Sequence, residues 1–199
     1  TSGVALLSVL VISGLKESLP NREKFKWSHL KVTGADWFDK RVLAPAIVMA
    51  LSLFSFGVLL TLVPDFSDEL QISNKGMAFT YLVVASMAVR LFGGRLSDVF
   101  GRVAVLRLAV VVQIAAMACL ALSTTESQLL WSAALYGLAS GFITPTLFAW
   151  TIDLTDNTTR GRGLSSVFIS LEIGIGLGAL SSGLIFNGSF ETLGYAFGV

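Results

Sequence analysis

The sequence predicts an all-α membrane protein, a polytopic bundle of transmembrane helices. Only 14% of its 199 residues are charged and 54% are hydrophobic, whereas a soluble domain carries about 25% charged residues. The apolar residues gather in runs of about 20, the length of helix that crosses a bilayer. These runs lack the alternation of apolar and polar residues that is typical of a half-buried β-strand. Because a backbone in lipid has to satisfy its own hydrogen bonds, helices are the expected form.

Charge and cysteine content argue against several other classes. The net charge is +1, which speaks against a disordered chain and against a nucleic-acid binder with a basic face. Cys119 is the one cysteine, so the chain holds no internal disulfide framework. His29 is the one histidine, and a single histidine with a single cysteine cannot build a zinc cluster. We therefore expect no metal, no cofactor and no nucleic-acid partner.

The segments follow one another with short connections. A truncated apolar segment at 1–15 opens the chain, which starts without Met and without a basic leader. Because the chain also ends in apolar residues, we expect a fragment of a longer protein. Full segments lie near 42–63, 76–97, 103–123, 129–153 and 164–186, and residues 195–199 begin a further one.

The cations fall on one side of these segments. Seven lie in the polar linker at 16–41, three surround the turn at 97–103, and two lie at 160–162. Together they are twelve of the fourteen Lys and Arg residues. The positive-inside rule therefore places the linker and both turns in the cytoplasm. We expect an integral protein of the plasma (inner) membrane.

A tight, charged turn joins the segments 76–97 and 103–123. Gly94 and Gly101 are small residues where the two helices approach each other. Asp98 is expected just before the next helix, where a carboxylate accepts hydrogen bonds from free N–H groups. Arg95 and Arg102 flank this carboxylate and can pair with it. Such a turn could lock helices together and release them when they rock.

This turn resembles the Gly-x-Leu-x-Asp-x-x-Gly-Arg signature of the major facilitator superfamily of secondary transporters. It departs from the signature at Val99 and Val103, where a basic residue is common. A second resemblance, to efflux-type members, is the Arg-Gly turn at 160–163, which leads into a glycine-rich helix. The matching positions of the first signature are Gly94, Leu96, Asp98, Gly101 and Arg102.

The resemblance implies a fold of twelve helices in two six-helix halves. The long basic linker would then join the halves, so residues 1–15 resemble the end of the sixth helix. Residues 42–186 resemble helices seven to eleven, and residues 195–199 the start of the twelfth. The implied partners are the absent N-terminal half, the bilayer, a small-molecule substrate and a coupling ion, which we expect to be a proton.

Glu172 is the one carboxylate well inside an apolar segment. A carboxylate there is costly unless it is paired, protonated or facing water. Protonation and release would suit a proton-coupling group, and the charge would also suit contact with a substrate. A structural hydrogen bond to a neighbouring helix is the equal alternative.

Other candidates rest on helical spacing or on the resemblance. Ser170 and the similarly spaced Gly174, Gly178 and Ser182 form a ridge of small residues that favours close helix packing. Arg90 is expected to make a structural or gating contact near the membrane surface. The tenth helix of the superfamily lines its cavity, which makes Tyr136, Ser140 and Thr144 candidate substrate contacts, with Ser52 and Ser55 as further candidates and core packing as the alternative for each.

The expected function is transport of a small organic solute by alternating access, proton-coupled and preferably exporting. The alternatives are a sensor or scaffold of the same fold that moves no substrate and, less favoured, a membrane-embedded enzyme. The sequence lacks a phosphate-binding loop of the Gly-x-x-x-x-Gly-Lys type. It also lacks a Ser/His/Asp set at membrane depth. We therefore do not expect an enzyme.

Overall fold

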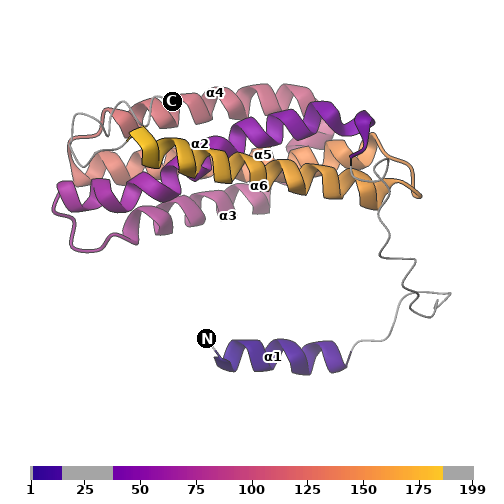
Figure 1. Ribbon diagram of the computed structural model, residues 1–199, viewed down its shortest axis with the longest axis horizontal. Helices are drawn as coiled ribbons and strands as arrows, with labels where there is room; N and C mark the ends of the chain where they lie inside the picture. Colours follow the sequence, from indigo (N-terminus) through magenta and orange to yellow (C-terminus); the bar gives the residue numbers. More distant parts are fainter. Residues whose placement is uncertain (1, 15–37, 186–199) are drawn as a thin grey trace. The chain divides into compact units, whose positions relative to one another are not determined.

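The computed structural model describes residues 2–14 and 38–185, which fall into two units, residues 1–34 and 35–199. In the first unit, α1 (Ser2–Ser13) is an apolar helix without acidic or basic residues at its ends. In the second unit, every described element is helical (Figure 1). The predicted all-α bundle is confirmed. The linker is described only from residue 38 onward, and the segment at 195–199 lies outside the described residues.

The second unit holds one short 3-10 helix, η3 (Lys40–Val42), followed by five α-helices. Among the described residues, four helices are long and apolar enough to cross a membrane: η3 with α2, then α4, α5 and α6. In α3 the apolar stretch Met77–Leu91 is shorter. The helices are α2 (Leu43–Glu69), α3 (Met77–Phe100), α4 (Arg102–Ala121), α5 (Glu126–Asp153) and α6 (Arg160–Ile185).

Several helix ends differ by a few residues from the sequence-based boundaries: α5 begins at Glu126 rather than near 129, and α6 begins at Arg160 rather than near 164. Two of the helices also end later than expected. The segment near 42–63 continues through Pro64 to Glu69, because a proline in a membrane helix removes only one N–H donor and neighbouring groups compensate. The segment near 76–97 continues to Phe100, so that only Gly101 separates α3 from α4. The predicted turn at 97–103 is therefore mostly helical.

The start of α5 follows from its sequence. Thr125 has an extended backbone, and its hydroxyl accepts a hydrogen bond from the N–H of Gln128. The Gln128 side chain in turn accepts a hydrogen bond from the backbone N–H of Thr124 at 2.8 Å. Thr and Gln side chains that accept hydrogen bonds from free backbone N–H groups in this way mark the first turn of a helix.

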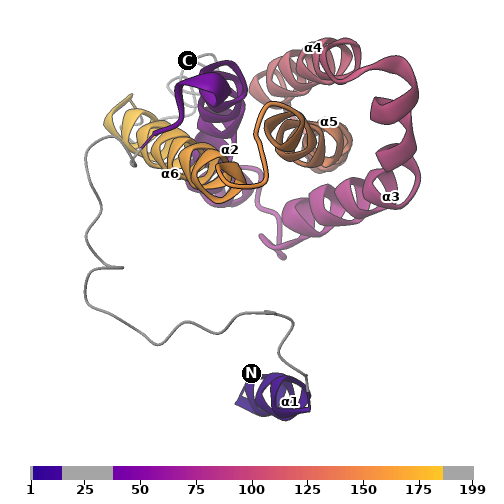
Figure 2. The same ribbon diagram turned by 90° about the vertical axis from the view of Figure 1, so that its right-hand side faces the viewer.

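The helices pack in two groups. The α2 helix packs on α6, whereas α5 lies between α3 and α4 (Figure 2). Glycines bring the backbones together: a Cβ atom at Gly178 would lie 2.0 Å from the carbonyl oxygen of Phe54, and one at Gly137 would lie 2.2 Å from that of Leu82. The contacts are too close for any side chain at either glycine.

The core of this unit consists of two apolar clusters. One gathers around Leu62, Leu120 and Leu129, and the other around Met49, Ile143 and Leu147. On α2 and α4, polar residues lie between the two clusters: Ser52 and Ser55 on α2, and Gln113 on α4. On α5, Ser140 follows Ala139 of the Met49 cluster.

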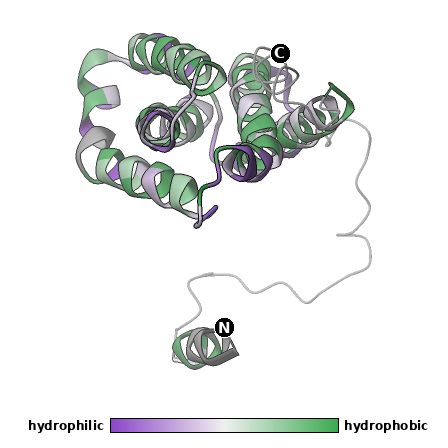
Figure 3. Cartoon of the chain, turned by 90° about the vertical axis from the view of Figure 1, so that its left-hand side faces the viewer, coloured by the Kyte–Doolittle hydropathy of each residue, from purple (hydrophilic) through white to green (hydrophobic). Residues whose placement is uncertain are grey.

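Apolar residues make up much of each helix, as the green colouring in Figure 3 shows, and many of the large ones are exposed. On α4, for example, Leu108, Val111 and Ile114 are each more than 60% exposed. A water-soluble protein rarely presents so many large apolar side chains together. This surface therefore suits contact with lipid.

Candidate functional site

A cavity of about 730 Å³ is lined by residues of α2, α3, α5 and α6 and by Gln113 of α4, and we call it the main cavity. Ligand pockets have volumes of about 300 to 1,000 Å³. Its walls are mostly apolar, including Phe56, Met87 and Leu171. The described residues contain no group of three or more His, Cys, Asp or Glu arranged to hold a metal. The polar residues that line the main cavity are Ser52, Ser86, Arg90, Gln113, Tyr136, Ser140 and Thr144.

Gln113 joins three helices behind this cavity. Its side chain is buried, with 4% of the residue exposed. The Nε2 atom lies 2.7 Å from the carbonyl oxygen of Ser52, 3.2 Å from Ser55 Oγ and 3.2 Å from the hydroxyl of Tyr136. The sequence-based interpretation missed Gln113. The signal was available, because Gln113 is the one amide in the apolar segment 103–123 and polar groups in membrane helices often bond to a neighbouring helix.

Tyr136 is held by its ring and by its hydroxyl. The ring is stacked on Phe56, with centroids 6.4 Å apart and an angle of 19° between the planes. The hydroxyl accepts the hydrogen bond from Gln113. A phenol that accepts one hydrogen bond still has its own proton to donate. The side chain is therefore fixed in place with one donor available.

The structure brings some of the predicted substrate contacts together and leaves others apart. Ser55 lies in a second cavity of about 720 Å³ between α2 and α4 and does not line the main cavity. Glu172 lines neither of these two cavities, and its side chain is exposed on α6. The predicted residues that share the main cavity are Ser52, Tyr136, Ser140 and Thr144.

Arg90 was expected to make a structural or gating contact, yet it lies on the wall of the main cavity. It is the one charged residue among those that line it, and it is exposed. The sequence alone could not place it there, because its direction depends on how α3 turns against α5.

The predicted small-residue ridge of α6 faces α2. Ser170, Gly174, Gly178 and Ser182 are all buried. A Cβ atom at Gly174 would lie 2.3 Å from the carbonyl oxygen of Ala50. These positions form the contact between the two helix backbones and do not line the main cavity.

At one end of the bundle, which we call the cation-rich end because it carries Arg41, Arg102 and Arg162, polar contacts join several helices. Arg102 is the centre of the first set. Its Nε donates to Asp153 Oδ2 at 3.0 Å, and a terminal nitrogen donates to Ser97 Oγ at 2.7 Å and to Asp98 Oδ1. One guanidinium therefore bonds to side chains of α3 and α5 from the first residue of α4.

The predicted role of Asp98 as a cap of the next helix is wrong. Asp98 lies inside the last turn of α3, and Gly101, which precedes α4, makes no side-chain capping bond. Gly101 has a φ of +89° and a ψ of 145°, a conformation that side chains other than glycine disfavour. Gly94 and Leu96 also lie within α3, and Leu96 is exposed.

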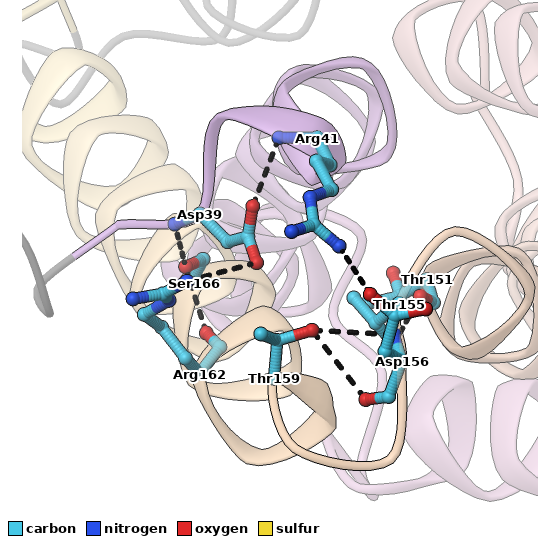
Figure 4. Close-up of polar contacts among 8 residues, drawn as sticks. All are labelled: Asp39, Arg41, Thr151, Thr155, Asp156, Thr159, Arg162 and Ser166. Carbon is cyan, nitrogen blue, oxygen red and sulfur yellow. Dashed lines mark hydrogen bonds and ion pairs between the residues drawn. The ribbon is translucent and has the colours of Figure 1, made fainter.

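A second set of contacts at the cation-rich end surrounds Asp39, which is buried (Figure 4). Its backbone N–H donates to Ser166 Oγ at 2.9 Å, and its carboxylate lies 3.7 Å from a terminal nitrogen of Arg162. Beside it, Arg41 donates to Asp156 Oδ2 at 2.7 Å. These contacts connect the residues before α2 with the start of α6 and with the loop that precedes it.

The comparisons with known proteins agree with these features. The model of the family described as Major Facilitator Superfamily matches residues 46–199, well over half of the chain. A search of curated proteins found no significant match. The matched region contains the main cavity and the Arg102 contacts. The chain belongs to the major facilitator superfamily, a family of membrane transporters of small solutes.

Proposed function

We propose that this chain forms the C-terminal half of a secondary transporter that moves a small organic solute by alternating access, exporting it at the expense of a proton gradient. The main cavity carries this proposal. Tyr136, Ser140 and Thr144 line it from one helix, beside residues of both apolar clusters of the bundle. A site near the middle of the helices is what rocking of two halves around a substrate requires.

The lining suits binding that is selective without being tight. Hydroxyl groups both donate and accept hydrogen bonds, and they are set in apolar walls such as Leu53 and Ile143. A solute with an apolar body and a few polar groups would match this pattern. The absent N-terminal half would complete the site.

The cation-rich end supplies contacts that could open and close on the cytoplasmic side. The pairs of Arg102 with Asp153 and of Arg41 with Asp156 involve side chains that are partly or largely exposed. Exposed ion pairs contribute about 0.2–1 kcal/mol each. Contacts this weak can form in one state of the cycle and separate in the other at small cost.

Glu172 is the candidate for proton coupling. It lies in the interior of α6, whereas the other described carboxylates lie near helix ends or in connections. Its exposure within this half leaves it accessible to water or to the partner half. We expect Glu172→Gln to keep solute exchange and to abolish the response to a proton gradient. Glu126→Gln, at the exposed start of α5, is the matched control and should behave as the unmodified protein.

The test is transport by the full-length protein in vesicles. The purified protein is reconstituted, a proton gradient is imposed, and accumulation is followed for a panel of radiolabelled organic solutes. Accumulation that collapses with a protonophore supports the proposal. If no solute in the panel moves under any gradient, the proposal is wrong and the sensor or scaffold alternative is favoured. If Glu172→Gln responds normally to the gradient, the coupling role is wrong.

A further inference from the structure

The main cavity has one charge on its wall, and that charge is positive. Arg90 is the one ionisable cation or carboxylate among the residues that line it. Its other polar lining groups are uncharged hydroxyls and one amide. A cavity with this lining attracts anions and offers no counter-charge for a cation.

The packing of α3 on α5 fixes the depth of Arg90. A Cβ atom at Gly137 would contact the carbonyl oxygen of Leu82, and one at Gly141 would contact that of Ser86. The two helices therefore run in the same direction, and one turn further along Arg90 is level with residues 144–145. Arg90 is ten residues from the end of α3 at Phe100, about 15 Å at the rise of a helix. It lies in the body of the helix rather than at its end.

The polar groups at this level have no partner within the part of the chain that the structure describes. Arg90 makes no ion pair there, and the hydroxyls of Ser86 and Thr144, which also line the cavity, make no hydrogen bond there. By contrast, Arg102 and Arg41 are paired with carboxylates. Arg90 is exposed on the wall of the cavity, near the end of the apolar stretch Met77–Leu91. An anionic partner for it would therefore come from outside the described residues.

We propose that the main cavity binds the acidic group of an organic anion, with Arg90 pairing with its charge and Ser86 and Thr144 donating hydrogen bonds to it. The apolar body of the solute lies against Phe56, Leu171 and Ile175, which line the same cavity. Guanidinium groups match the geometry of carboxylate, phosphate and sulfonate oxygens because their donors form a planar fork. This inference rests on the proposed transport function and names the class of solute.

Three probes of one shape and different charge test the inference. They are 2-naphthalenesulfonate, its neutral sulfonamide and the 2-naphthyltrimethylammonium cation. Binding to the purified full-length protein is measured by calorimetry, and flux is measured in vesicles. We expect the sulfonate to bind, and the neutral and cationic probes to bind at least tenfold more weakly. Arg90→Gln should weaken sulfonate binding by about ten- to a hundredfold, the range for a hydrogen bond to a charged group.

Two further variants separate recognition from folding. Arg90→Lys keeps the charge and should retain part of the affinity. Arg107→Gln, an exposed cation on α4 that does not line the cavity, should bind the sulfonate normally. Equal binding of the three probes, or unchanged sulfonate binding in Arg90→Gln, overturns the inference. Absence of binding for all three probes also overturns it.

The flux measurements distinguish this inference from the proposed function. If the cation or the neutral probe moves while the sulfonate does not, transport stands and the anionic class is wrong. If the sulfonate binds through Arg90 and no probe or panel solute moves, the anion site stands and transport is wrong.

Discussion

Arg102 and Asp153 join the first residue of α4 to the last residue of α5, with Nε and Oδ2 3.0 Å apart. The two residues are 51 positions apart in the chain. The same guanidinium bonds to Ser97 and Asp98 in the last turn of α3. One side chain, 22% exposed, therefore holds the ends of three helices in register at the cation-rich end.

A double-mutant cycle on Arg102→Ala and Asp153→Ala should measure this contact. We expect a coupling free energy of about 0.2–1 kcal/mol, because the pair is partly exposed and water screens it. Denaturant unfolding of the full-length protein in detergent measures each variant. The coupling should shrink as the salt concentration rises.

The pair formed by Lys75 and Asp68 is the control for this cycle. It is also exposed, but both residues lie at the opposite end of the bundle, seven positions apart. Its disruption should leave transport unchanged, whereas Asp153→Ala should lower the transport rate. A coupling energy of zero between Arg102 and Asp153 would show that their approach contributes nothing to stability.

Gly101→Ala should destabilise the protein by about 1–3 kcal/mol, because an L-residue is strained at a φ of +89°. No side chain stands in the way, since a Cβ atom at Gly101 meets nothing within 4 Å. The loss of stability would therefore come from backbone strain alone. Gly161→Ala, an equally open position without a positive φ, should be neutral or slightly stabilising. Equal effects of the two variants would contradict this account of the α3–α4 junction.

The local pattern of the sequence predicts the helices and part of the lining of the main cavity. Runs of about 20 apolar residues predict membrane helices, and a helix occupies most of the described part of each predicted full segment. Tyr136, Ser140 and Thr144 are spaced by one helical turn, which is why they share one cavity in the structure. Periodicity therefore finds residues that share a face of one helix.

The contacts between helices could not be predicted from the sequence alone. The bond of Asp39 to Ser166 spans 127 positions, and that of Arg41 to Asp156 spans 115. Neither follows from local spacing, because it depends on how α2 and α6 pack. The end of α3 was also missed, since a single glycine of positive φ turns the chain without the longer polar loop that usually marks a boundary.

Gly178→Ala should push α6 away from α2. The new Cβ would lie 2.0 Å from the carbonyl oxygen of Phe54, and a backbone atom cannot move aside as a side chain can. Overpacking of this kind costs about 1–3 kcal/mol, occasionally more. Gly176→Ala, on the same helix with open space around it, is the matched control and should not destabilise. Thermal unfolding of the two variants in detergent compares them, and equal midpoints would contradict the close approach.

Gln113→Leu and Tyr136→Phe should impair the same hydrogen bond. Each change removes one partner of the 3.2 Å contact between Nε2 and the Tyr136 hydroxyl, and Tyr136→Phe keeps a ring that can stack on Phe56. Hydrogen bonds between membrane helices contribute about 0.6 kcal/mol on average and up to about 1.7 kcal/mol. Because the residues touch, the two effects on stability should not add.

The same pair should also affect the solute. With the Gln113 amide gone, the Tyr136 hydroxyl is free to turn, so we expect a severalfold rise in KM with a smaller change in the maximal rate. Tyr81→Phe is the matched control, because Tyr81 packs edge-on against Trp131 and does not line the main cavity. Vesicle transport by the full-length variants measures both parameters. Additive effects on KM in the double variant would mean that Gln113 and Tyr136 act independently, and an unchanged KM in Tyr136→Phe would remove the hydroxyl from solute recognition.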